Sequence, residues 1–182
     1  EFWSRNAYRA KLKTPLEFVV SSLRATDADV ENATALAAAL DRLGMPLYGV
    51  QQPNGYSLKA DPWLGAEALL ARMNFALALT ANRFPGVSVT IPEGTAQAAE
   101  HDELTLEETL LDGRVAPHTH DLVLQEMEST QTTPVTVAAF SKGRAGKGGH
   151  DPFAPTLRGN VPVNQSALAA ALLLGSPDFQ RR

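Results

Sequence analysis

The chain has 182 residues, of which 44% are apolar and 20% charged, and this balance predicts one helical globular domain, 1–182. A net charge of -4 with scattered Lys and Arg predicts no nucleic-acid partner, because phosphate backbones require an extended basic surface. The lack of Cys excludes disulfides, thiolate zinc sites and cysteine nucleophiles. The longest apolar run, 167–174, is well short of the roughly 20 residues of a membrane span, so no span is predicted.

The clearest helix start lies in the segment 14–17. Thr14 can cap a helix, Pro15 suits the first helical position, and Glu17 completes a capping box. We therefore predict a helix over about 15–25. Apolar residues at positions i, i+3, i+4 and i+7 predict one buried stripe, made of Leu16, Val19, Val20 and Leu23.

A second helix is predicted over about 30–43, with Asp29 as its cap and Gly44 placed to end it. The short connection before it predicts an antiparallel helical hairpin with the first helix. Segment 44–56 contains Gly, Pro and an Asn-Gly dipeptide, which are typical of turns. A long and unusually apolar loop is expected there.

The strongest helix signal covers about 62–82, where Asp61 can cap and Pro62 suits the first position. Its wide apolar face consists of Leu69, Met73, Ala76, Leu77 and Thr80. The following segment, 86–91, alternates apolar and polar residues, as a short strand or an extended connector does. Because no pairing partner is obvious nearby, the connector is the preferred interpretation.

Further helices are predicted in the last part of the chain. Thr105 and Glu108 form a capping box for a helix over 105–112, and Pro117 starts another helix. Segment 130–160 is rich in Thr, Gly, Pro and basic residues, which predicts a long loop or a mobile insertion.

The final helix is predicted to start at Asn164 or Ser166 and to run through Leu174. It is apolar on nearly every side, so it should be central to the core. The predicted fold is therefore all-α, an irregular helical bundle of five to seven helices with long loops. Its core helices are those at 15–25, 62–82 and 164–174.

The pair His118 and His120, beside Asp121, is the best candidate for a metal site. In a strand both rings would share a face, but on a helix starting near Pro117 they point about 200° apart. Only His120 and Asp121 with distant partners would remain as ligands. The preferred interpretation is solvated residues in the first turn of a helix.

Other chemical signatures are incomplete. The glycine-rich segment 143–150 lacks the Ser or Thr and the glycine spacing of a nucleotide-binding loop. Serines occur without a Gly-x-Ser-x-Gly elbow. Several carboxylates are interpreted as solvated helix faces: Glu107, Glu108, Asp112, Glu126 and Glu128. We therefore assign no catalytic residue and predict no tightly bound metal, flavin or nucleotide cofactor.

Aromatic residues in the loops form the remaining candidate surface. Tyr48, Tyr56 and Trp63 share one Gly- and Pro-rich region, where rings either pack onto the helices or stack against a bound partner. The chain also opens without an initiator methionine on a basic stretch with Phe2, Trp3 and Tyr8, which favours a fragment of a longer protein. All six residues are candidates for a binding or interface surface.

Several segments together resemble the bacterial family catalogued as domain of unknown function 1800. They include Phe2-Trp3-Ser4, Thr14-Pro15-Leu16-Glu17-Phe18-Val19-Val20-Ser21, Gly44-Met45-Pro46-Leu47-Tyr48-Gly49 and Leu173-Leu174-Gly175-Ser176-Pro177-Asp178-Phe179-Gln180. In order and spacing they look like the C-terminal region of that family.

The resemblance implies a longer, largely helical parent protein that is exported and therefore periplasmic or extracellular. It supplies no catalytic residues. The expected role is a non-catalytic structural or interaction module, and the alternative is a supporting part of a hydrolase that acts on an extracellular polymer. The expected partner is the N-terminal part of the parent or a second copy of the chain.

Overall fold

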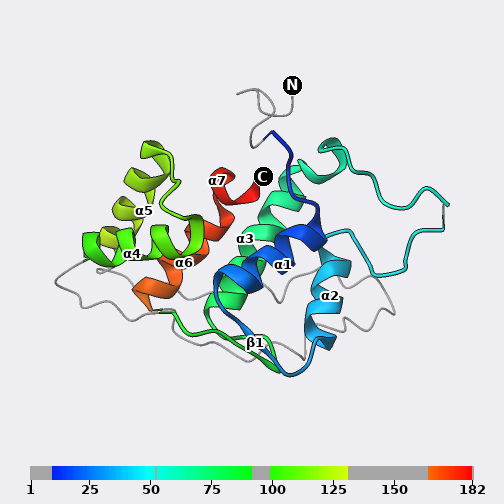
Figure 1. The fold of residues 1–182 in the computed structure, drawn as a ribbon, viewed down its shortest axis with the longest axis horizontal. Helices are drawn as coiled ribbons and strands as arrows, with labels where there is room; N and C mark the ends of the chain where they lie inside the picture. Colours follow the sequence, from blue (N-terminus) through cyan, green and yellow to red (C-terminus); the bar gives the residue numbers. More distant parts are fainter. Residues whose placement is uncertain (1–9, 52, 92–98, 131–163, 182) are drawn as a thin grey trace.

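Helices make up most of the computed structural model, which describes residues 10–51, 53–91, 99–130 and 164–181 (Figure 1). The helices are α1 (Pro15–Ala25), α2 (Thr34–Arg42), α3 (Ala66–Thr80), α4 (Ala99–Leu111), α5 (Pro117–Thr130), α6 (Gln165–Gly175) and α7 (Pro177–Gln180). A 3-10 turn, η1 (Asp61–Trp63), precedes α3. The prediction of an all-α, irregular bundle is confirmed. The predicted loop at 130–160 lies, after Thr130, outside the described residues.

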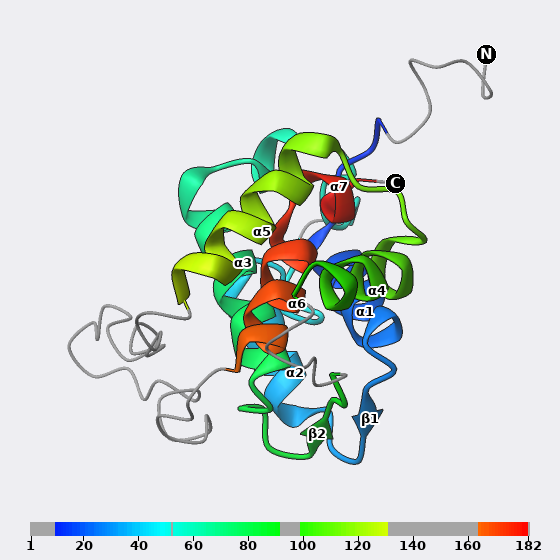
Figure 2. The ribbon, with the colours of Figure 1, turned by 90° about the vertical axis from the view of Figure 1, so that its left-hand side faces the viewer.

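The apolar helix α6 occupies the centre of the fold, as predicted. It packs against α3, α4, α5 and α7, and Figure 2 shows it enclosed by α3, α4 and α5. Asn164 caps it, because the amide of Ala167 donates to the Asn164 side chain at 2.7 Å. At its C-terminal end a Cβ added to Gly175 would lie 1.9 Å from Sδ of Met73, so glycine permits the close approach of α6 to α3.

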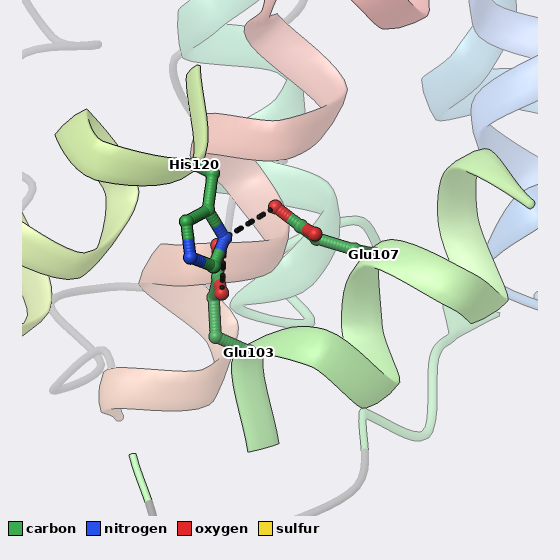
Figure 3. A group of neighbouring side chains, drawn as sticks. All are labelled: Glu103, Glu107 and His120. Atoms are coloured by element: carbon green, nitrogen blue, oxygen red, sulfur yellow. Dashed lines mark hydrogen bonds and ion pairs between the residues drawn. The ribbon is translucent and has the colours of Figure 1, made fainter. Parts of the chain in front are cut away.

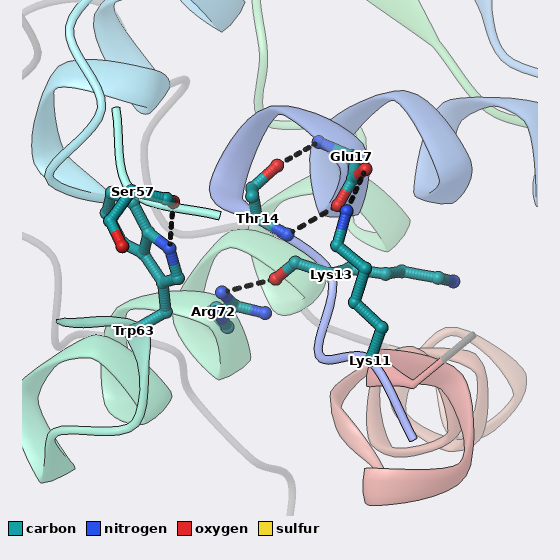
Figure 4. Close-up of polar contacts among 7 residues, drawn as sticks. All are labelled: Lys11, Lys13, Thr14, Glu17, Ser57, Trp63 and Arg72. Carbon is teal, nitrogen blue, oxygen red and sulfur yellow. Dashed lines mark hydrogen bonds and ion pairs between the residues drawn. The ribbon is translucent and has the colours of Figure 1, made fainter. Parts of the chain in front are cut away.

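The capping box of α1 is confirmed. The Thr14 amide donates to the Glu17 carboxylate at 2.8 Å, and the Glu17 amide donates to the Thr14 hydroxyl at 3.4 Å (Figure 4). The predicted buried stripe is wrong in part, because Leu16 and Val20 are 38% and 39% exposed. Phe18 faces the core instead, with its ring edge-on to two other rings, those of Phe75 and Phe179. The large ring determines which side of α1 is buried.

A short antiparallel sheet corrects the prediction of a connector at 86–91. Strand β1 (Asp29–Val30) pairs with β2 (Val87–Ser88). The partner strand lies far away in sequence, so neighbouring residues do not reveal it. Asp29 consequently belongs to a strand and α2 starts only at Thr34, whose amide donates to the Asn32 side chain. Two further helices also start at other residues than predicted. Helix α3 begins at Ala66 rather than at 62, and α4 begins at Ala99 rather than at 105.

The first and last described segments lie side by side. The amide of Lys13 donates to the carbonyl of Gln180 at 2.8 Å. Arg72, only 1% exposed, donates to the Lys13 carbonyl at 2.8 Å (Figure 4) and to the Gln180 side chain at 3.3 Å. Burial lowers the pKa of the Arg72 guanidinium. This arginine therefore joins α3 to both segments.

Among the described helices, none combines the length and the apolar character needed to cross a membrane.

Candidate functional site

A polar cluster lies between α4 and α5 (Figure 3). Glu103 and Glu107 are one turn apart on α4, so both side chains leave the same face of the helix. His120, in the first turn of α5, points between them. The three donor atoms lie within 4.8 Å of one another.

The hydrogen bonding of this cluster is incomplete. Nδ1 of His120 lies 3.0 Å from Oε1 of Glu107 and 2.8 Å from Oε2 of Glu103. The contact with Glu107 has hydrogen-bond geometry, and the shorter contact with Glu103 is an ion pair when His120 is protonated. The side chain of Glu103 is completely buried, and neither of its carboxylate oxygens has a hydrogen-bond partner among the described residues.

Burial also determines the protonation of the cluster. Burial, followed by the hydrogen bond and charge of the neighbouring Glu107, raises the pKa of Glu103 to about 7 against the opposing effect of His120. For His120, burial lowers the pKa. The hydrogen bond to Glu107 and the charges of Glu103, Glu107 and Asp121 outweigh that effect, so the pKa of His120 is raised.

The sequence predictions for these residues are only partly correct. His118 is exposed while His120 turns inward, so the prediction that the two rings diverge on a helix is confirmed. The interpretation of His120 and Glu107 as solvated is wrong, because the Glu107 side chain is 9% exposed and the His120 side chain 27%. Glu103 was missed. It occupies the i position of the buried stripe that continues through Leu106, Glu107, Leu110 and Leu111.

The residues of the predicted aromatic surface differ in their exposure to solvent. Trp63 is 6% exposed and its indole N–H donates to the Ser57 carbonyl at 3.1 Å (Figure 4). The Tyr56 hydroxyl donates to the Pro46 carbonyl, and its ring lies 6.3 Å from that of Trp63. Tyr48 is fully exposed, with a φ of 58°. The other three candidates, Phe2, Trp3 and Tyr8, lie outside the described residues.

Two shallow hollows lie on outer helix faces. The first follows α1 and is lined by Lys13, Leu16, Glu17, Val20, Ser21 and Arg24. The second follows α4 and is lined by Leu104, Thr105, Glu108 and Thr109. The α1 hollow has two exposed apolar side chains beside charged ones, and the α4 hollow has Leu104 beside Glu108.

The comparisons with known proteins give one match. The family model described as a protein of unknown function, DUF1800, covers residues 1–181. Neither curated proteins nor solved structures give a significant match. Because the family model covers almost the whole chain, the chain belongs to the DUF1800 family of proteins of unknown function.

Proposed function

We propose that this chain is a non-catalytic interaction module of an exported bacterial protein and that it associates with a second copy of itself through the outer face of α1. The observation that carries the proposal is the pair Leu16 and Val20. They lie one turn apart, both are more than a third exposed, and they form the apolar floor of the α1 hollow. Exposed apolar surface with a polar rim marks interfaces.

Charge complementarity supports a second copy as the partner. The α1 hollow has Lys13 and Arg24 on its rim, while Lys11 pairs with Glu17 at 3.1 Å. Residues 99–130, by contrast, are rich in Asp and Glu and contain a single Lys or Arg, Arg114. Lys13 and Arg24 on the rim of the α1 hollow of one chain can therefore pair with Glu108 on the outer face of α4 of another.

The α4 face also offers apolar surface to this contact. Leu104 is 48% exposed and lines the α4 hollow beside Glu108. A contact between two different faces is heterologous, so it continues from chain to chain unless the rotation closes a ring. The expected products are oligomers that grow with protein concentration.

The alternative role, support of a hydrolase active site, would be favoured by a cleft in this chain that contains an accessible acid or base. Among the described residues, Glu103 and His120 have raised pKa values, but Glu103 is completely buried and neither residue lines the two hollows. A buried carboxylate that substrate cannot contact does not protonate a leaving group. We therefore prefer the interaction role. Export and a periplasmic or extracellular location are part of the same proposal and rest on the resemblance to the family.

Sedimentation velocity tests the proposal. Oligomers are expected at low salt and fewer at 0.5 M salt, because salt screens surface charges. Val20→Asp should weaken association at least tenfold, whereas Leu70→Asp, at an apolar α3 residue that is 61% exposed, should leave it unchanged. Arg24→Glu should also weaken association, and adding Glu108→Arg should restore it.

Two results would contradict self-association through these faces. The first is a monomer at all concentrations up to about 0.1 mM at low salt, which would direct attention to another part of the parent as the partner. The second is association that Val20→Asp and Leu70→Asp weaken equally, because the interface would then not be specific to α1.

A further inference from the structure

We propose that Glu103, Glu107 and His120 bind one divalent transition-metal ion, with Zn²⁺ as the first choice. Two carboxylates and one imidazole are donors that Zn²⁺ shares with Mn²⁺ and Fe²⁺, and imidazole favours these ions over Mg²⁺ and Ca²⁺. The site lies on the inner face of α4, so the proposal is independent of self-association through the outer face.

The spacing of the donor atoms fits a common metal. Two ligands at about 2.1 Å from an ion lie about 3.4 Å apart in the tetrahedral geometry of Zn²⁺ and about 3.0 Å apart in an octahedral geometry. The observed distances from Nδ1 of His120 to the carboxylates of Glu103 and Glu107 are 2.8 and 3.0 Å. An ion can therefore lie between the three donors with small side-chain movements.

The unsatisfied carboxylate is an independent indication of a ligand. Glu103 is completely buried, and among the described residues its carboxylate has no hydrogen-bond partner besides the 2.8 Å ion pair of Oε2 with Nδ1 of His120. An ionised carboxylate in such a place is destabilising by several kcal/mol unless a charge or donors compensate it. His120 cannot balance both carboxylates, because a protonated imidazole carries one positive charge and its Nδ1 faces Glu103 and Glu107 together. A divalent cation balances both carboxylate charges at once.

The scaffold holds the ligands rigidly and leaves a path for the ion. Two ligands leave one face of α4 and the third comes from α5, and both helices pack against α6. Ligands on packed helices keep their geometry better than ligands on loops. The His120 side chain is 27% exposed, so the ion has access from solvent on that side. Three protein ligands leave a coordination position for water.

The test uses the whole chain, first stripped with chelator and then dialysed against Zn²⁺ or Mn²⁺ alone. Elemental analysis should find about one ion per chain, and the melting temperature should rise. Glu103→Gln keeps the shape of the side chain but removes its charge, and it should weaken binding at least tenfold, as should His120→Ala. Two controls should bind like the wild type: His118→Ala, at an exposed His two residues away, and Glu108→Gln, on the outer face of α4.

Far-UV circular dichroism of each variant confirms that it is folded. The proposal is overturned if the wild-type chain binds neither ion at about 0.1 mM. It is also overturned if folded Glu103→Gln and His120→Ala bind as well as the two controls, because the ion would then be held elsewhere.

Discussion

The central helix α6 meets two regions of different chemistry. On the α3 side the contact is made by buried apolar residues, among them Phe75, Ala76 and Leu79. On the other side, α4 and α5 contribute Leu106, Leu110, Val123 and Met127, but they also bury Glu103 and Glu107 between them. The α3 side is held mainly by apolar packing, which depends little on solution conditions, whereas the stability of the α4–α5 side is expected to vary with pH.

The largest expected effect is a core truncation on the α3 side. Leu79 is completely buried, so Leu79→Ala should lower the free energy of unfolding by about 3 kcal/mol, through lost burial and the cavity that remains. Urea denaturation at pH 5 and pH 8 should give the same loss at both values. Leu70→Ala, at an exposed residue of the same helix, should change stability by less than about 0.5 kcal/mol. Equal losses in the two variants would contradict the buried face of α3.

An intermediate effect is expected on the α4–α5 side of the metal-free chain. The pKa of Glu103 in the folded chain is raised to about 7, and that of His120 is raised as well. A folded-state pKa above the unfolded value adds stability at low pH that is lost as pH rises through the folded pKa. The free energy of unfolding should therefore fall by roughly 1 to 3 kcal/mol between about pH 4.5 and pH 8.

The variant Glu103→Gln isolates this contribution. An amide carries no charge to desolvate, so the variant should be more stable than the metal-free wild type at pH 8 and nearly equal to it at pH 5. Glu108→Gln, at an exposed residue on the same helix, is the control and should leave the pH profile unchanged. A wild-type profile that is flat between pH 5 and 8 in the presence of chelator would contradict the raised pKa of Glu103.

The apolar core around α6 could largely be predicted from the sequence. The uniform Ala and Leu composition of α6 indicates burial on every side, and Asn164 and Thr14 signal helix starts through their own short-range hydrogen bonds. The pairing of β1 with β2 could not be predicted, because strand partners distant in sequence leave no local signal. The orientation of α1 depends on contacts between Phe18 and rings from other helices, which periodicity does not contain.

The polar cluster between α4 and α5 was harder to predict from the sequence. A carboxylate on a short amphipathic helix is usually solvated, and His120 has partners thirteen and seventeen residues earlier on another helix. One signal was present, however. Glu103 and Glu107 fall in register with Leu106 and Leu110, so they occupy positions that an apolar stripe would fill. Acidic residues in such a register predict a buried polar site, once the helix is known to begin at Ala99 rather than at 105.

The smallest expected effect concerns how α5 is fixed in place. The residue before α5 is Ala116, which has no side chain that could cap the helix, and Asp178 of α7 supplies the missing acceptor. Its carboxylate accepts from the Ala116 amide at 3.1 Å and from the Thr119 hydroxyl at 2.7 Å. A carboxylate at a helix N-terminus also interacts favourably with the helix dipole.

Asp178→Ala should therefore cost about 1 kcal/mol, the usual effect of losing a helix cap. The loss should be largest at the start of α5, because the carboxylate bonds Ala116 and Thr119 there, next to His120. Hydrogen exchange should become faster at residues 116–120 while α3 and α6 stay protected. Asp112→Asn is the matched control, since Asp112 is exposed, its 3.7 Å contact with Arg114 is a surface ion pair, and Asn tolerates its positive φ of 53°. If exchange accelerates equally across α3, α6 and the first turn of α5, Asp178 stabilises the whole core and α5 has no separate cap.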